Sequence, residues 1–270
     1  MGRLQGKVAF VTGGGSGLGR GMVDLFAAEG ASVLALEIRK DWAQATEAEL
    51  RAKGCKVVAL AGDVTSAADV RNAVQRCVSE WGRLDILVNN AGVSGSAPKD
   101  LVDLPMADWD KVMAVNVTGA LLCLKEAAPA IRDSGGGSII NVTSISARSC
   151  YPGNGGYGIS KAALEALTRQ ASVELAAWRI RVNSMSLGWF RTALNEHVYQ
   201  RPGELARRNA TIPLSRIGTI EDCAKLALFL ASDDSSYITG ESIESDGGLI
   251  TAALKSTFEL ARMRPTPESA

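Results

Sequence analysis

A tyrosine and a lysine stand four residues apart in the stretch GNGGYGISKAAL, at positions 157 and 161. Residues four apart share one face of a helix, so Tyr157 and Lys161 lie side by side in any helix that begins here. A free tyrosine titrates near pH 10 and is a poor base at neutral pH, whereas a nearby positive charge favours the phenolate. The spacing therefore allows an acid–base pair, but it also fits the first turn of a packed helix.

A glycine-rich loop follows the first apolar run, in the sequence TGGGSGLGRG. The common G-x-G-x-x-G dinucleotide pattern is not met, and the spacing is Gly13-xxx-Gly17-x-Gly19. Turns without side chains let a pyrophosphate approach backbone N–H groups at a helix N-terminus. The alternative is a turn needed only for tight packing of strand against helix. We expect a phosphate site formed by five residues: Gly13, Ser16, Gly17, Leu18 and Gly19.

Glu37 ends the second apolar run, about two dozen residues after the first glycine. A carboxylate at this position can accept both ribose hydroxyls of adenosine and would repel a 2′-phosphate. Glu37 therefore favours NAD over NADP as the cofactor. Arg39 and Lys40 follow closely and could reach a phosphate if the chain bends towards it.

Short apolar runs alternate with longer helical patterns along the chain. The periodicity predicts strands at 7–12, 32–37, 56–62, 84–90, 137–144, 180–186 and 241–248, and helices at 18–29, 41–53, 66–81, 107–132, 157–177 and 220–231. This alternation is typical of a Rossmann-type, doubly wound parallel sheet of about seven strands, with helices on both faces. No linker interrupts residues 1–270, so we expect a single domain. Residues 189–215 break the pattern and are predicted to cover the substrate, and 249–270 form a C-terminal tail.

Composition narrows the class of partner. The 29 basic and 29 acidic residues cancel, without a run of like charge, which argues against nucleic acid or a membrane surface. No signal peptide and no segment of membrane-spanning length is recognised. The five cysteines are scattered and never form a CxxC pair, so they are expected to be reduced and mostly buried. These features predict a cytoplasmic protein with a small-molecule substrate.

The chain has one histidine, His197. Zinc sites built on histidine and Ser-His-Asp hydrolysis would both depend on this residue, which lies in a polar helical stretch without a cysteine nearby. We therefore expect no metal site and assign His197 a structural role.

Four further polar positions fall at the ends of predicted strands or within a long helix: Asp63 in GDVT, the NNAG of residues 89–92, Asn116 in VNVTG and Ser144 in NVTS. The carboxyl ends of parallel strands meet at one edge of a sheet, so Ser144 is expected to face the same cleft as the glycine loop. Each of these residues, taken alone, also fits a purely structural role.

Together with YGISK, these motifs resemble the short-chain dehydrogenase/reductase family, from KVAFVTGGGSGLG to SDGG. The resemblance implies hydride transfer between the C4 atom of a nicotinamide and a carbinol carbon. It implies that Tyr157 is the general acid or base, that Lys161 lowers the pKa of its phenol and binds the nicotinamide ribose, and that Ser144 holds the substrate oxygen. Asn116 would interrupt its helix and hold a water that links the lysine to solvent.

The resemblance also assigns cofactor contacts and an assembly state. Asp63 and Val64 would contact adenine; Asn90, Ala91 and Gly92 would support the cofactor from beneath; and Thr192 would bind the carboxamide. The family usually has Pro-Gly before this threonine, whereas this chain has Leu187-Gly188, for which we expect looser positioning of the nicotinamide side. A homo-oligomer, a tetramer or dimer, is implied.

The motifs predict an NAD-dependent alcohol dehydrogenase or ketone reductase. Two alternatives stay open: a non-catalytic dinucleotide-binding regulator, and an epimerase or dehydratase that uses NAD on the same scaffold. Candidate walls of the substrate pocket are residues 94–97, 145–151 and 193–212, with Trp189 and Phe190. The two aromatics favour an apolar or cyclic substrate, although they fit packing of the covering segment equally well. Arg148 could pair with an acidic group of the substrate or form a surface salt bridge.

Overall fold

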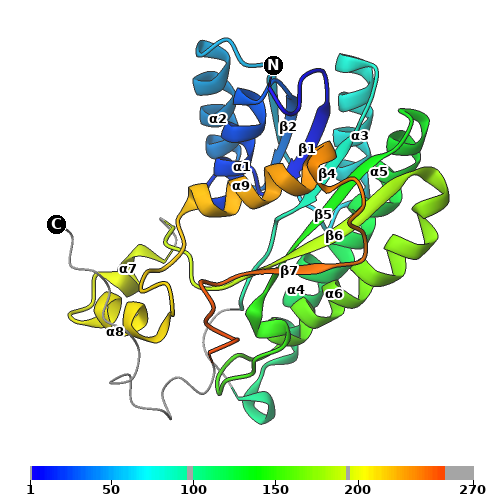
Figure 1. Ribbon diagram of the computed structural model, residues 1–270. Helices are drawn as coiled ribbons and strands as arrows, with labels where there is room; N and C mark the ends of the chain where they lie inside the picture. Colours follow the sequence, from blue (N-terminus) through cyan, green and yellow to red (C-terminus); the bar gives the residue numbers. More distant parts are fainter. Residues whose placement is uncertain (1, 96–99, 193–194, 253–270) are drawn as a thin grey trace.

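A seven-stranded parallel sheet forms the centre of the computed structural model, which describes residues 2–95, 100–192 and 195–252 (Figure 1). The strands lie in the order β3-β2-β1-β4-β5-β6-β7, so the direction of winding reverses between β1 and β4. The predicted doubly wound fold and strand number are confirmed. The strands are β1 (Val8–Thr12), β2 (Ser32–Glu37), β3 (Val57–Ala61), β4 (Ile86–Asn89), β5 (Gly137–Ser144), β6 (Ile180–Leu187) and β7 (Ser242–Ser245).

Helices cover both faces of the sheet, which explains why the sequence of β1 is apolar up to its last residue, Thr12. Ala9 and Val11 pack on one side with α1 (Gly17–Ala28) and α9 (Ile220–Ala231), whereas Val8 and Phe10 pack on the other. Alternate side chains of a strand point to opposite faces, so a strand buried on both faces loses the polar alternation of a surface strand. The second layer contains α3 (Ala67–Trp81), α5 (Ala120–Asp133) and α6 (Tyr157–Glu174), and α2 (Lys40–Ala52) packs beside β2 and β3.

The helix predicted at 107–132 is divided by a wider turn. α4 (Met106–Met113) runs into a π-helical segment, Ala114–Gly119, before α5 begins. The continuous run Met106–Asp133 is long and apolar enough to cross a membrane by length and composition, which differs from the expectation that no segment approaches such a span. Its apolar character has a structural explanation, because α5 buries Cys123, Ala127 and Ile131 in the core layer beside the sheet.

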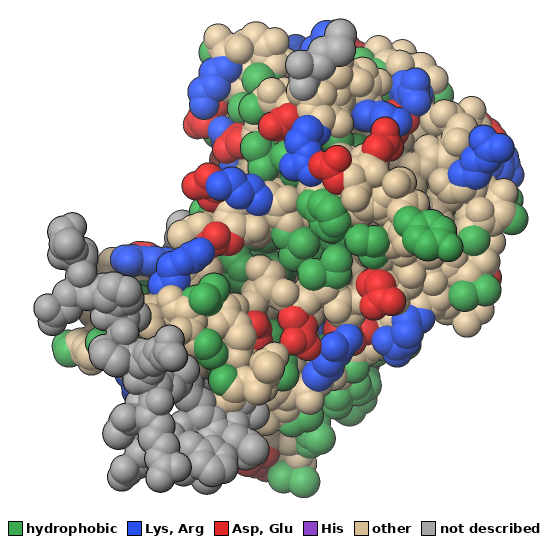
Figure 2. Space-filling view, viewed as in Figure 1, with side chains coloured by type: hydrophobic (Ala, Val, Ile, Leu, Met, Phe, Trp, Pro, Cys, Tyr) green, Lys and Arg blue, Asp and Glu red, His purple; other side chains and the backbone are tan. Residues whose placement is uncertain are grey.

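The segment that interrupts the alternation, 189–215, contains two short helices, α7 (Glu196–Tyr199) and α8 (Glu204–Thr211). They pack around a small separate cluster of Tyr199, Ile212 and Ile217, to the side of the main sheet (Figure 1). The described part of this segment contributes no strand to the sheet, and its role in covering the substrate stays a prediction. Residues 193–194 of the segment and 253–270 of the tail lie outside the described residues. On the face that carries α9 and β7, acidic and basic side chains are interspersed (Figure 2).

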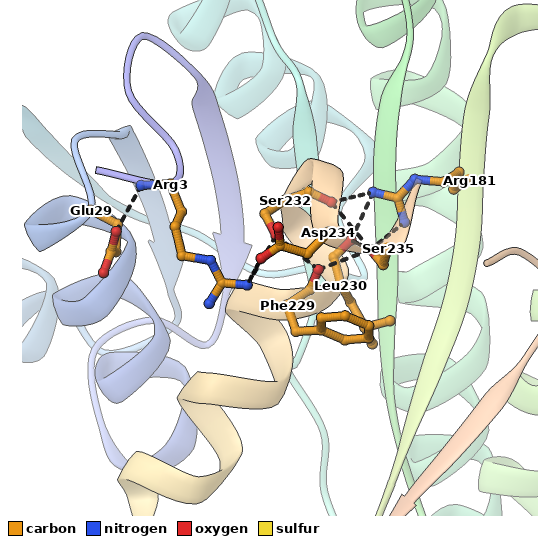
Figure 3. Close-up of polar contacts among 8 residues, drawn as sticks. All are labelled: Arg3, Glu29, Arg181, Phe229, Leu230, Ser232, Asp234 and Ser235. Carbon is orange, nitrogen blue, oxygen red and sulfur yellow. Dashed lines mark hydrogen bonds and ion pairs between the residues drawn. The ribbon is translucent and has the colours of Figure 1, made fainter. Parts of the chain in front are cut away.

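An arginine of β6 holds the C-terminal end of α9. The Arg181 guanidinium donates to the carbonyls of Leu230 and Ser232, at 3.0 and 3.1 Å, and to Ser235 Oγ at 2.8 Å (Figure 3). The last carbonyls of a helix have no partner within the helix, and a cation there also interacts favourably with the negative end of the helix dipole. Burial lowers the pKa of Arg181, which indicates that this contact is shielded from water.

We expect Arg181→Ala to lower the free energy of unfolding by about 2 kcal/mol, because it removes three hydrogen bonds of a charged donor in a partly buried site. Arg3→Ala is the matched control, because Arg3 joins the same region through an ion pair with Asp234 whose side chains are 38% and 58% exposed. Exposed pairs contribute less than about 1 kcal/mol. Urea unfolding of both variants measures the difference, and equal losses would contradict the role given to Arg181.

Candidate active site

The glycine loop joins β1 to α1 at the carboxyl edge of the sheet. Two of its glycines show that a side chain has no space: a Cβ on Gly19 would lie 2.0 Å from the Gly13 carbonyl oxygen, and one on Gly15 would lie 2.7 Å from Glu37 Cγ. Gly13 and Gly17 have φ values of 64° and 53°, which favour glycine. The loop therefore needs its glycines for its own shape, and it ends with backbone N–H groups of a helix N-terminus, which attract anions.

Ser16 is the residue at which α1 is capped, and its side chain forms no capping hydrogen bond within the described part of the chain. Leu18, in the first turn, packs against the apolar core below the loop. Of these two predicted cofactor contacts, Ser16 thus keeps a hydroxyl at the helix N-terminus, whereas Leu18 offers only its backbone.

The Glu37 carboxylate is buried at the end of β2 and is held by backbone amides. It accepts hydrogen bonds from the N–H groups of Gly15 and Arg39, each at 3.1 Å, and the residue is 5% exposed. The Arg39 side chain is directed elsewhere: it pairs with Asp41 at 2.7 Å and lies over the Trp42 ring at 4.1 Å. Negative charge is therefore fixed beside the glycine loop, and Arg39 is paired with another carboxylate.

Thr12 is a site residue that the sequence analysis missed. Its Oγ1 accepts hydrogen bonds from the N–H groups of Asn90 and Ala91, both at 3.0 Å. The Asn90 amide donates in return to the carbonyls of Thr12 and Gly13, at 2.9 and 3.1 Å. These bonds tie the NNAG segment to the glycine loop. A polar residue that ends an otherwise apolar strand, immediately before the glycines, was the available signal.

Asp63 and Val64 follow β3 and shape a neighbouring turn. The Asp63 side chain accepts from the Thr65 N–H at 2.8 Å, and its own N–H donates to Asp69 at 2.9 Å. Val64 is buried and packs against Gly119 of the π-helical segment, where a Cβ would lie 2.9 Å from Val64 Cγ2. Asp63 and Val64, the predicted adenine contacts, are thus held by local interactions at the carboxyl edge of the sheet, where the glycine loop also lies.

Ser144, Tyr157 and Lys161 come together where β5 ends and α6 begins. Tyr157 is the first residue of α6, and interaction with the Ser144 side chain acts to lower the pKa of its phenol. Lys161 Nζ lies 5.7 Å from the centre of the Tyr157 ring and donates to the Val142 carbonyl at 2.8 Å. The residue is 4% exposed. The lysine and tyrosine therefore share a helix face, and the lysine also anchors α6 to β5.

Burial changes the acidity of both groups. It lowers the pKa of Lys161 to about 8, since the charged ammonium loses water. Burial raises the pKa of Tyr157, and the interaction with Ser144 acts in the opposite direction. The resemblance implied a pKa of Tyr157 lowered by Lys161; in this structure the pKa is instead raised, because desolvation of the phenolate outweighs the stabilising contacts.

Asn116 lies in the π-helical segment, as the implied interruption of its helix requires. Its Oδ1 accepts from the Val93 N–H at 2.8 Å, and its Nδ2 donates to the Val93 carbonyl and to Ser160 Oγ, each at 2.9 Å. Ser160 donates in turn to the Tyr157 carbonyl at 2.6 Å. A Cβ on Gly92 would lie 3.3 Å from both Asn116 Oδ1 and Lys161 Nζ, which places this glycine between them.

The departure at Leu187 is accommodated by the sheet. Leu187 is the last residue of β6, pairs with Ser144 on one side and Ser245 on the other, and is buried in the core. The regular pairing limits the freedom expected from the loss of proline. Gly188 has no room for a side chain, because a Cβ would lie 2.7 Å from Asp246 Cα. Thr192 faces the glycine loop, since its Cβ lies 3.7 Å from the position of a Cβ on Gly17.

The aromatic residues of the predicted pocket wall are occupied by packing. Phe190 is 6% exposed within the main core, and Trp189 packs beside the small cluster with the Arg208 guanidinium over its ring at 4.6 Å. The packing alternative therefore holds for both. Arg148 forms ion pairs with Glu165 and Glu244, so the salt-bridge alternative holds for it as well. Residues 96 and 97 lie outside the described part of the chain.

Comparisons with known proteins agree with this geometry. A family model described as enoyl-(acyl carrier protein) reductase matches residues 13–250. The chain is 38% identical over 248 residues to the 3-oxoacyl-[acyl-carrier-protein] reductase FabG of Thermotoga maritima, covering 92% of this chain and 99% of that protein. It is 38% identical over 246 residues to the 2,5-dichloro-2,5-cyclohexadiene-1,4-diol dehydrogenase LinX of Sphingobium indicum, covering 91% and 97%.

A solved structure of a 7α-hydroxysteroid dehydrogenase, in complex with NADH and 7-oxo glycochenodeoxycholic acid, superimposes with a TM-score of 0.86. The two chains are 34% identical, and the match covers 91% of this chain and 95% of the other. The family match over residues 13–250 includes the glycine loop and the group around Tyr157.

The lowered pKa of Lys161 predicts a specific dependence of stability on pH. Folded and unfolded chains both carry the proton below pH 8, whereas between about 8 and the ordinary value of 10.5 only the unfolded chain keeps it. The wild-type protein should therefore gain on the order of 2 kcal/mol relative to Lys161→Met between pH 7 and pH 10. Urea unfolding at the two pH values measures this gain.

Lys225→Met is the matched control, because the Lys225 side chain is 66% exposed on α9. No comparable gain is expected for it, and a wild-type gain of the same size against both variants would contradict the burial argument.

Proposed function

This chain belongs to the short-chain dehydrogenase/reductase family of oxidoreductases, and we propose that it transfers a hydride between NAD(H) and a secondary alcohol or ketone. The observation that carries the proposal is the placement of Ser144 at the end of β5 and of Tyr157 at the start of α6, next to the buried Lys161. The names of the relatives support a carbinol or carbonyl carbon as the reacting centre, since they specify a 3-oxoacyl group, a diol and a hydroxysteroid.

The residues at the carboxyl edge fit a nicotinamide dinucleotide. The backbone of the glycine loop packs closely against neighbouring residues. A Cβ on Gly13, for example, would lie 2.9 Å from Asn90 Nδ2. A pyrophosphate would be held at this helix N-terminus, with the adenosine ribose at Glu37 and the nicotinamide side towards Thr192. When bound, the nicotinamide accepts a hydride from the alcohol carbon or returns it to the ketone.

In the proposed reaction, Ser144 holds the substrate oxygen and Tyr157 exchanges a proton with it. During oxidation the Tyr157 phenolate takes the proton of the alcohol. During reduction the Tyr157 hydroxyl donates a proton to the substrate oxygen. Lys161 binds the ribose and adds positive charge on the phenol side of the site. Burial opposes phenolate formation, so this charge is needed more than in an exposed site. Asn116 fixes the turn beside Lys161 through its bonds to Val93 and Ser160.

We propose NAD as the preferred cofactor because of the charges around the adenosine position. The Glu37 carboxylate is fixed by two backbone amides and would accept ribose hydroxyls but repel a phosphate. Arg39 is paired with Asp41 and stacked on Trp42, so binding a 2′-phosphate would require these contacts to break.

Tyr157→Phe tests the acid–base role, because it removes the hydroxyl and keeps the ring. We expect NAD binding to persist while turnover of secondary alcohols falls by about 100-fold or more. Formation of reduced nicotinamide is followed by absorbance across a panel of secondary alcohols, and binding by fluorescence titration. Tyr237→Phe is the control at a fully exposed tyrosine. Retained turnover in Tyr157→Phe would refute the mechanism.

Glu37→Gln tests the cofactor preference, since the amide keeps the shape of the side chain and removes its charge. The ratio of kcat/KM with NAD to kcat/KM with NADP should fall by on the order of tenfold, because repulsion of the 2′-phosphate is lost. Glu49→Gln, at an exposed carboxylate of α2, should leave the ratio unchanged. An unchanged ratio in Glu37→Gln would show that this carboxylate does not select the cofactor.

A further inference from the structure

A buried glutamate follows Tyr157 and Lys161 on the next turn of α6. Glu165 is four residues beyond Lys161 and 5% exposed, and the mechanism proposed above does not use it. A buried carboxylate is costly unless it has charged or hydrogen-bonding partners. Two such partners come from other parts of the fold: Arg148 Nε donates to Glu165 Oε2 at 3.2 Å, and Ser242 Oγ donates to Oε1 at 2.7 Å.

Arg148 connects three elements. Its guanidinium also donates to Glu244 Oε1 of β7 at 3.1 Å, so one side chain links the segment after β5 to α6 and to the edge strand. Two carboxylates pair with this arginine, which favours the salt-bridge alternative over an acidic group of the substrate. The pair with Glu165 also differs from an ordinary surface pair, because the Glu165 side chain is 6% exposed, whereas Glu126 in the Arg71–Glu126 pair is 27% exposed.

The turn that carries Arg148 also orients Ser144. The Ser146 N–H donates to Ser144 Oγ at 3.2 Å, and the N–H groups of Arg148 and Ser149 donate to the Ile145 carbonyl at 3.0 and 2.8 Å. The Ser144 oxygen thus accepts a backbone hydrogen bond from the same short turn whose far end is held by Arg148. Movement of that turn would change the direction in which the Ser144 hydroxyl meets Tyr157 and the substrate oxygen.

We infer that Arg148 is a positioning residue for Ser144 and that Glu165 is its buried anchor. This inference rests on the proposed function for its catalytic consequence, and on the hydrogen bonds alone for its structural one. The guanidinium fork spans two carboxylates at a fixed geometry, which a lysine cannot reproduce with a single ammonium. The ion pair acts on the reaction through the turn, without contact to the substrate.

The test compares Arg148→Ala and Glu165→Gln with Arg71→Ala, which breaks a matched Arg–Glu pair between α3 and α5. Hydrogen exchange of the peptide covering residues 145–151 should be faster in the first two variants and unchanged in the third. For the best alcohol of the panel, kcat should fall by on the order of tenfold, since small displacements of positioning groups reduce rates strongly, while the Kd for NAD stays the same. Arg148→Lys should recover only part of the loss.

The double variant of Arg148→Ala and Glu165→Gln should be no less active than the less active of the two single variants, because both substitutions remove the same contact. Unchanged exchange of 145–151 in Arg148→Ala and Glu165→Gln, or effects equal to those of Arg71→Ala, would overturn the inference. Faster hydrogen exchange of residues 145–151 in these variants with an unchanged kcat would overturn the positioning role of Arg148. If the wild-type protein oxidises no alcohol of the panel, the proposed function fails, and the exchange rates still decide whether Arg148 and Glu165 hold the turn.

Discussion

The candidate site depends on one buried cation, the Lys161 ammonium, and on its hydrogen bond to the Val142 carbonyl. A charged group without water needs strong partners, and this one obtains a partner from the backbone of β5 near the end of the strand. The contact fixes the start of α6 against β5, so that Tyr157, one turn earlier, meets Ser144 at the strand end. The desolvation that lowers the pKa of Lys161 to about 8 is part of the same arrangement.

Side-chain bonds to the backbone hold the loops around this cation. Thr12 and Asn90 join the ends of β1 and β4, and Asn116 joins the residue after NNAG to α6 through Ser160. Loops at the edge of a parallel sheet have few ladder hydrogen bonds, so buried polar side chains must satisfy their amides and carbonyls. The polar residues of the motifs thus serve the shape of the site as well as its proposed chemistry.

Carboxylates near the site are fixed rather than free. Glu37 accepts two backbone amides beside the glycine loop, and Glu165 accepts Arg148 and Ser242 behind Ser144. A charge held in this way keeps its place when a ligand binds, which reduces the cost of reorganisation at the site. The sequence offers two arginines, Arg39 and Arg148, as candidates for a phosphate or an acidic substrate, and both are paired with carboxylates in the fold.

The sequence by itself determined the strands, the main helices and the positions of the motifs. Continuous apolar runs predicted the strands, because both faces of a parallel sheet are covered, and helical spacing placed Tyr157 beside Lys161. The tertiary structure decided which groups are buried and which partners they meet. The upward shift of the Tyr157 pKa, the packed state of Phe190 and the anchoring of Arg148 by Glu165 depend on contacts between distant segments. Local periodicity carries no information on those contacts, because desolvation and hydrogen bonding arise only when the segments pack together.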